Sequence, residues 1–215
     1  MSAAAPTAQA RAAAALRAAI LDGELRPGQR VSQEAWAERT GVSLIPVREA
    51  LGALAGEGLV TYRPRRGYAV TELDLADLEE VYRLRAVLEE DALRRGVPAA
   101  EDEDVESLAA ADDAFRDALR NGDVGARLAA NRRFHALLHG LARSAPLARL
   151  IDQLWDTTEA YRALYYALPG EAEEATRAHA ELLAAVRARD ADRAVVAQAA
   201  HRERALERLR RVLGA

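Results

Sequence analysis

Apolar residues recur every three or four positions along most of this chain. From residue 75 onward the spacing follows the 3.6-residue period of amphipathic helices, and no alternating strand pattern interrupts it. Gly96, Pro98, the pair at 121–122 and the pair at 169–170 mark the ends of successive segments. The predicted helices cover about residues 75–95, 101–120, 123–143, 146–168, 171–189 and 191–213. Six long helices with short links predict an all-α antiparallel bundle.

The first part of the chain has shorter elements. One helix is predicted over residues 7–22, ending at Gly23, and another over residues 32–40 with Ser32 as its cap. Gly41 can take the left-handed conformation that ends this helix. Ser43 is a good N-cap for the next helix, and Pro46 falls in its first turn, where a missing N–H costs little. Two short helices around a tight glycine turn predict a helix-turn-helix.

Two short β-type runs follow, over residues 59–62 and 68–71. Residues 63–67, Arg-Pro-Arg-Arg-Gly, separate them, so the pattern predicts a hairpin with arginines at its tip. A helix-turn-helix followed by such a hairpin is typical of winged helix-turn-helix domains. Its second helix would enter the DNA major groove, and its wing would lie along phosphates or in the minor groove.

Particular side chains of this head are expected to contact duplex DNA. Arg48 lies about one turn after the cap and can offer two donors to guanine O6 and N7. Ser43 and the helix N-terminus can hold a phosphate through N–H groups. The exposed edge of the head is predicted to comprise Ser43, Leu44, Ile45, Arg48, Arg65, Arg66 and Gly67. Trp36, Val47, Leu51, Leu54 and Leu59 are predicted to form its core.

The composition is that of a globular protein. Of 215 residues, 50% are hydrophobic and 30% charged, and no apolar run approaches the roughly 20 residues that span a bilayer. The chain has no cysteine, which excludes disulfides and thiolate metal sites. These features predict a cytoplasmic protein without a membrane segment.

Charge is distributed unevenly between the two predicted parts. The net charge is −4, but residues 1–73 hold nine arginines against seven acidic residues, a net of +2. The remaining residues, 74–215, carry a net of −6. The asymmetry is mild and agrees with a DNA-binding domain at 1–73 joined to an acidic helical domain at 74–215.

The N-terminal motifs resemble the GntR family of bacterial transcription regulators. The resemblance rests on three blocks in order: Leu-Asp-Gly-Glu-Leu-Arg-Pro-Gly at 21–28, Gly-Val-Ser with Pro-Val-Arg-Glu-Ala-Leu within 41–51, and Glu-Gly-Leu-Val at 57–60. It implies a winged helix-turn-helix fold and no enzymatic activity. Two departures stand out. Leu44 and Ile45 replace an arginine and a small polar residue, so base contact there would be apolar, for example to a thymine methyl group. Glu34 stands where many members place a DNA-contacting arginine.

The second half resembles the FCD effector domain of the FadR-type branch of this family. The matching pieces are Val-Tyr-Arg-Leu-Arg-Ala-Val-Leu-Glu at 81–89, Asn-Arg-Arg-Phe-His at 131–135, His179 and His201. Six predicted helices rather than seven point toward the VanR-like subgroup. The resemblance implies a homodimer that binds an inverted-repeat operator and responds to a small-molecule effector.

The chain has only four histidines, His135, His139, His179 and His201, all in its helical half. They fall on three predicted helices that can converge inside a bundle, and neutral imidazole is a preferred ligand for Zn and Ni. The histidines therefore predict one divalent metal ion per chain. Because His139 follows His135 by four residues, these two could also form a two-histidine face, and single histidines often serve only as core residues.

The family resemblance implies a particular ligand set: Asn131, His135, His179 and His201. It leaves His139 either as a packing residue or as one that contacts a metal ligand without binding the metal. Asn131 replaces the usual aspartate, so a neutral amide oxygen stands in place of an anion. That replacement should weaken the attraction for a divalent cation.

The resemblance also implies an effector site. Arg83 and Arg85 lie on a helix expected to line the same cavity, and a guanidinium suits a bidentate contact with a carboxylate. The expected function is a repressor released by a small carboxylate. The alternative is a regulator for which the metal ion itself is the signal. A metal hydrolase is disfavoured, because neither a His-Glu-x-x-His motif nor a nucleophile elbow is present.

Overall fold

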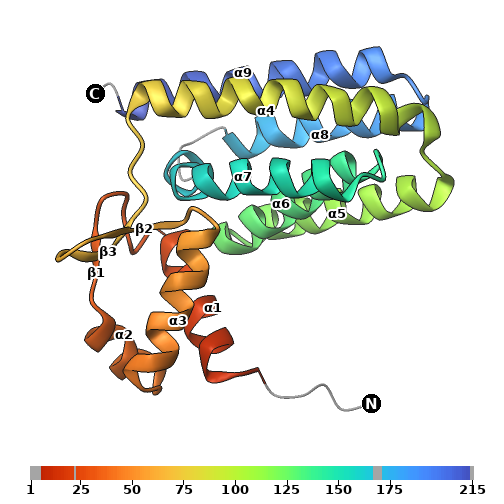
Figure 1. Cartoon of the computed structure of the whole chain (residues 1–215). Helices are drawn as coiled ribbons and strands as arrows, with labels where there is room; N and C mark the ends of the chain where they lie inside the picture. The colour runs from red at the N-terminus through yellow and green to blue at the C-terminus, as the bar shows by residue number, and fades with distance from the viewer. Residues whose placement is uncertain (1–5, 22, 167–170, 214–215) are drawn as a thin grey trace. The chain divides into compact units, whose positions relative to one another are not determined.

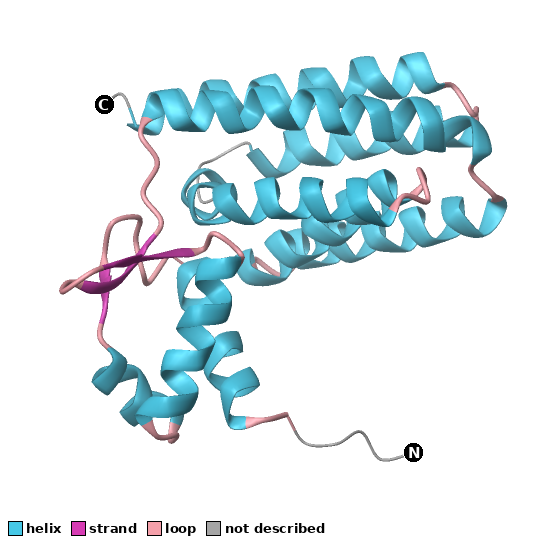
Figure 2. Cartoon of the chain, in the orientation of Figure 1, coloured by secondary structure: helices cyan, strands magenta, loops and turns pink. Residues whose placement is uncertain are grey.

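The computed structural model describes residues 6–21, 23–166 and 171–213. It divides the chain into two compact units (Figures 1 and 2). The first comprises residues 1–73 and 156–163, and the second comprises residues 74–155 and 164–215. No helix in the described ranges is both long and apolar enough to cross a membrane.

The first unit combines three helices with a small antiparallel sheet (Figure 2). Its elements are α1 (Ala8–Leu21), β1 (Arg30–Val31), α2 (Gln33–Thr40), α3 (Leu44–Gly56), β2 (Val60–Arg63) and β3 (Gly67–Val70). The sheet order is β1-β3-β2, with Tyr62 opposite Tyr68 in the hairpin. The two-residue strand β1 was not predicted, because a strand this short has no period to detect.

The predicted turn between α2 and α3 is present, with Gly41 in the left-handed conformation. The Ser32 hydroxyl accepts a hydrogen bond from the Ala35 N–H at 3.2 Å and so caps α2. Gly41 ends α2 in the left-handed conformation, with φ of 65°. Ser43 occupies the N-cap position of α3, but its side chain makes no capping hydrogen bond. Pro46 is the third residue of α3 and has no N–H, so one of the two donors that an N-cap side chain ordinarily uses is missing here.

The core of the first unit lies between α1, α2, α3 and the sheet. The five core residues predicted from the sequence, Trp36, Val47, Leu51, Leu54 and Leu59, are all buried there. Leu16 and Ile20 complete the core from α1. Helix α3 is therefore held in the core by its Val47, Leu51 and Leu54 side, and its opposite side is exposed.

The second unit is helical throughout its described residues. Its elements are α4 (Leu75–Gly96), the 3₁₀ turn η1 (Val97–Ala99), α5 (Asp102–Arg120), α6 (Val124–Gly140), α7 (Ala145–Tyr166), α8 (Glu171–Arg187) and α9 (Ala191–Leu213). Residues 156–163 of α7 group with the first unit. These six α-helices of the described chain match the predicted ones to within about three residues at their ends, and residues 167–168 lie outside the described range.

Side-chain caps and close helix packing fix this unit. The carboxylates of Asp74 and Asp123 each accept a backbone N–H at the start of α4 and α6, both at 2.8 Å. Helices α4 and α9 pack side by side and run in opposite directions (Figure 1). Gly96 lies so close to the end of α6 that a Cβ there would come within 2.5 Å of the Ala142 nitrogen. Only glycine allows this approach.

Candidate nucleic-acid interface and metal centre

The first turn of α3 is exposed although it carries large apolar side chains. Leu44 is 42% exposed and Ile45 68% exposed, whereas Val47 is fully buried. Ser43 is also exposed, and its hydroxyl is not used for capping. The helix thus presents uncapped N–H groups, a hydroxyl and two apolar side chains to the surroundings, a combination suited to a phosphate and a base methyl group.

Arg48 lies on the same exposed side of α3. Its Nε donates to Oε1 of Gln33, the first residue of α2, at 3.3 Å. The contact uses only Nε, and Arg48 is exposed, so the two terminal nitrogens of the guanidinium are available as donors. Sequence reasoning missed Gln33, because its proximity to Arg48 arises from the angle between two helices and not from any spacing along the chain.

The wing presents the predicted arginines at its tip. The Arg66 N–H donates to the Arg63 carbonyl at 3.0 Å, which closes a tight turn, and both Arg65 and Arg66 are exposed. Arg65 adopts a φ of 64°, a left-handed conformation that is uncommon for a residue other than glycine. Gly67 has a φ of 82°, so a side chain there would be strained.

A surface hollow lies beside the wing. Arg30, Val31, Ser32, Gln33, Glu34 and Gly67 line it. The carboxylate of Glu34 accepts a hydrogen bond from the Ser32 hydroxyl at 3.0 Å. Its own backbone amide and the Ser32 hydroxyl lower the pKa of Glu34, which keeps it ionised. The acid that departs from the family pattern therefore lies close to Gln33 and Arg30 in the hollow.

Three of the four histidines meet inside the second unit. One ring nitrogen from each of three histidines, His135 on α6, His179 on α8 and His201 on α9, lies within 4.8 Å of the other two. His135 and His179 are buried and His201 is partly exposed. Imidazole nitrogen is a preferred ligand of Zn and Ni, so this set of convergent donors suits either ion.

Asn131 joins this cluster. It is fully buried, one turn before His135 on α6, and its Oδ1 lies 3.1 Å from Nε2 of His179. The structure therefore brings together the whole ligand set that the resemblance implied. Three imidazoles and one amide oxygen fit a divalent ion of the zinc or nickel type by the chemistry of their donor atoms.

Asp112 on α5 is a site residue that sequence reasoning missed. Its Oδ1 lies 3.2 Å from Nδ1 of His179, and its Oδ2 accepts from Nε of Arg116 at 2.8 Å. Burial raises the pKa of Asp112, but the hydrogen bonds from His179 and Arg116 outweigh it and leave the pKa below its ordinary value. A signal was present: Asp112 follows Leu108 by four residues, so this acid lies on the apolar face of its helix.

His139 does not belong to the three-histidine cluster. It is buried one turn after His135, and burial is the main cause that lowers the pKa of His139 to about 4, against the opposing charge of Glu89. The residue is therefore a neutral imidazole in the core of the bundle.

A buried carboxylate lies at the centre of a polar network next to the histidines. Glu89 on α4 is fully buried and accepts four side-chain hydrogen bonds. The donors are Arg85 Nε at 2.9 Å, Trp155 Nε1 at 2.9 Å, Gln198 Nε2 at 2.8 Å and Arg202 Nη1 at 3.1 Å. The Trp155 ring in turn lies 4.9 Å from the ring of His135. Arg85 thus reaches the neighbourhood of the histidine cluster.

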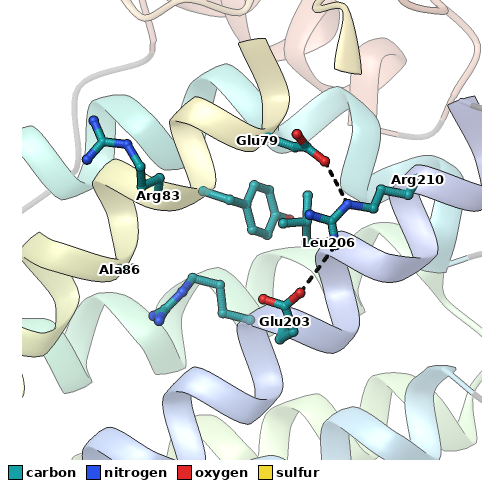
Figure 3. A pocket seen from close by; sticks show the side chains of 8 residues that line it. Glu79, Arg83, Ala86, Glu203, Leu206 and Arg210 are labelled. Carbon is teal, nitrogen blue, oxygen red and sulfur yellow. Dashed lines mark hydrogen bonds and ion pairs between the residues drawn. The ribbon is translucent and has the colours of Figure 1, made fainter. Parts of the chain in front are cut away.

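The structure places Arg83 elsewhere. Arg83 is exposed and donates to Glu80 at 2.7 Å and 2.6 Å. It lines an open pocket between α4 and α9. Arg210 also lines this pocket and donates to Glu79 at 2.8 Å and to Glu203 at 3.3 Å (Figure 3). Arg85 does not line this pocket, so the two arginines expected in one cavity occupy different places.

Comparison with known proteins identifies the family. Residues 8–70 match the bacterial regulatory proteins of the gntR family, and residues 80–204 match the FCD domain. The chain belongs to the GntR family. Its relatives and its fold are those of transcription regulators and not of enzymes. Assignment to the VanR-like subgroup stays a prediction.

Three curated relatives illustrate the similarity of this GntR regulator to known proteins. The transcriptional regulator McbR of Escherichia coli is 31% identical over 170 residues, which cover 78% of this chain and 77% of McbR. The regulator YdhC of Bacillus subtilis is 29% identical and covers 92% of this chain and 89% of YdhC. The transcriptional repressor RspR of Escherichia coli is 26% identical and covers 92% of this chain and 86% of RspR.

Solved structures agree with this assignment. The structure of Escherichia coli McbR/YncC superposes with a TM-score of 0.83 at 25% identity, covering 96% of this chain and 99% of that one. A GntR-type regulator from Rhodococcus sp. RHA1 gives a TM-score of 0.79 at 27% identity, with 96% and 98% covered.

Proposed function

We propose that this GntR regulator is a homodimeric repressor that releases its operator when a small carboxylate binds to the helical domain. Two copies would present two winged helix-turn-helix heads to a short inverted repeat, because the symmetry of a dimer is matched by the symmetry of its operator. Such a protein acts on the chromosome in the bacterial cytoplasm. Its similarity to the repressor RspR supports the repressing direction.

The observation that carries the proposal is the exposed, uncapped first turn of α3 with Arg48 beside it. In this account Arg48 reads a guanine, Leu44 and Ile45 contact a thymine methyl group, and Ser43 binds a phosphate. Arg65, Arg66 and Gly67 form the part of the wing that follows the backbone or enters the minor groove.

The donor set around His179 supports a divalent ion, Zn or Ni, with one ion per chain. Asn131, His135, His179 and His201 would hold it. When bound, such an ion supplies an electrophilic point to which a carboxylate can attach. Removing a ligand by His179→Ala is expected to abolish stoichiometric metal, measured by metal analysis of the purified chain. Finding no Zn or Ni in the wild type, with no thermal shift on adding either, contradicts this part.

Arg85 is the better placed of the two effector arginines. Its Nε is taken by Glu89, whereas its buried Nη1 has no hydrogen-bond partner among the described residues. That nitrogen can donate to one oxygen of an effector carboxylate near the histidine cluster. Arg83 would act only from the surface pocket between α4 and α9.

A binding experiment tests the whole proposal. Duplexes selected from a random pool by the wild-type protein should contain an inverted repeat and bind two chains each. Small carboxylates, added to the metal-loaded complex, should release the labelled DNA. Titration of DNA affinity against free Zn without any carboxylate distinguishes the alternative, in which the ion itself is the signal and changes DNA affinity alone.

A further inference from the structure

Two aromatic rings of the helical unit pack against the ring of His179. It stacks on Phe134 with ring centres 4.0 Å apart, and it forms an edge-to-face contact with Phe115 with ring centres 4.9 Å apart. His179 is fully buried, so its orientation is set by this packing and by whatever its two nitrogens contact.

The two nitrogens of His179 face different oxygens. Nε2 lies 3.1 Å from Oδ1 of Asn131, in the cluster of donor atoms. Nδ1 lies on the other side, 3.2 Å from Oδ1 of Asp112. A carboxylate accepts but does not donate, so Asp112 selects the tautomer with its proton on Nδ1. That tautomer leaves the lone pair of Nε2 directed at the donor cluster.

Asp112 is itself held in position. Its second oxygen, Oδ2, accepts from Nε of Arg116 one turn later on α5, at 2.8 Å. The side chain of Asp112 is buried, whereas that of Asp113 next to it is exposed. The chain thus places one of two adjacent acids inside the bundle, against a histidine.

The donor set carries no negative charge, which makes the contact between Asp112 and His179 significant. Among the described residues, the cluster of close donors consists of the imidazoles of His135, His179 and His201, joined by the neutral amide of Asn131. A divalent cation there would have no anion among its ligands. Asp112 is a carboxylate one hydrogen bond away from such a ligand.

We propose that Asp112 is a positioning residue of the metal centre and supplies, through His179, the negative charge that Asn131 does not provide. The hydrogen bond would orient the imidazole and raise its basicity, which strengthens its bond to a cation. This inference rests on the proposed metal binding.

The test compares the zinc affinity of purified full-length variants, measured by competition with a chelating dye. Asp112→Asn keeps the size of the side chain and removes its charge, and should weaken zinc binding by about 10- to 100-fold. Asp113→Asn is the matched control and should leave the affinity unchanged. Thermal unfolding of the metal-free variants separates this effect from a merely structural one, which would lower stability without changing the zinc affinity of the folded protein.

A second pair of variants makes the charge argument specific. Asn131→Asp places a carboxylate directly in the donor set, so it should restore zinc affinity to Asp112→Asn. The loss caused by Asp112→Asn should also be smaller in the Asn131→Asp background than in the wild type. Equal losses in both backgrounds contradict compensation by Asp112.

The outcomes separate this inference from the proposed function. Wild-type protein that binds no zinc overturns both this inference and the metal-binding part of the proposed function, and leaves the proposed DNA binding untouched. Wild-type protein that binds zinc as tightly as Asp112→Asn overturns only the role of Asp112. Should Asp112→Asn fail to fold, nitrogen-15 spectra of the zinc-loaded wild type decide the matter. The inference requires zinc on Nε2 of His179 and a proton on Nδ1, and the reverse assignment refutes it.

Discussion

Nε of Arg85 donates to Oε1 of Glu89 at 2.9 Å, and the two side chains are only 5% and 0% exposed. Glu89 also accepts hydrogen bonds from Trp155, Gln198 and Arg202, so donors from α4, α7 and α9 meet on one carboxylate. A buried charge held in this way stabilises the fold only while its partners are present.

Replacing Glu89 by Gln should therefore destabilise the protein strongly. Arg85 would keep a buried charge without its counter-ion, and we expect the free energy of unfolding to fall by about 3–5 kcal/mol. Urea denaturation at pH 7 measures it. Glu90→Gln is the matched control, because Glu90 is exposed and its pair with Arg94 should contribute at most about 1 kcal/mol. A loss for Glu89→Gln no larger than that of the control contradicts the prediction.

The same pair predicts a pH dependence. Burial raises the pKa of Glu89, but the charges of Arg85, His139 and Arg202 and the hydrogen bond from Gln198 leave it well below 4.5, the ordinary value. A carboxyl whose pKa is lower in the folded state contributes stability above its unfolded pKa and loses it as pH falls. The difference between wild type and Glu89→Gln should stay constant from pH 7 to 5 and shrink only below about pH 4.5. Shrinkage already between pH 7 and 6 contradicts it.

The helices could be predicted from the sequence because each one carries its own signals. The 3.6-residue period extends over every helix of the bundle, and caps such as Ser32, Asp74 and Asp123 lie at the helix starts. Ser43 shows the limit of this reasoning: the residue type suits a cap, but its hydroxyl makes no capping hydrogen bond, and Pro46 removes one of the two N–H groups that could have donated it.

The histidine cluster could be found because histidine is rare in this chain, and three of its four copies converge. The partners of the buried acids Asp112 and Glu89 could not be predicted from the sequence. Asp112 meets a histidine 67 residues later, and Glu89 meets Gln198 109 residues later. Such contacts depend on which helices become neighbours, which a periodic pattern does not specify. An acid on an apolar face signals that a buried partner exists, without naming it.

The two cap serines should respond differently to substitution by alanine. Ser32→Ala removes a hydrogen bond to the Ala35 N–H and should cost about 0.5–2 kcal/mol of unfolding free energy. Ser43→Ala removes an exposed hydroxyl that caps nothing, so its effect should stay within about 0.5 kcal/mol. Thermal or urea unfolding of both variants measures the contrast. An equal loss for the two serines shows that Ser43 caps α3 after all.

Arg65 should lower the stability of the fold and strengthen DNA binding. Its φ of 64° costs about 1–2 kcal/mol for a residue with a Cβ, whereas glycine adopts it freely. Because glycine also gains freedom in the unfolded chain, Arg65→Gly should stabilise the protein by at most about 1 kcal/mol. The same variant should bind DNA more weakly, with a salt slope reduced by about 1, if Arg65 contacts a phosphate. Arg66→Ala is the comparison, since it should weaken DNA binding without the gain in stability.

The central claim is that the exposed side of α3 and the wing bind duplex DNA. Fluorescence anisotropy of a selected operator duplex, titrated with wild type and Arg48→Ala at fixed salt, tests it most directly. We predict a loss of about 1–3 kcal/mol of specific binding for Arg48→Ala, with relaxed preference at one base pair. Arg193→Ala, which removes an exposed arginine of α9, should bind as wild type does. Equal operator affinity and equal base preference for wild type and Arg48→Ala would contradict the account.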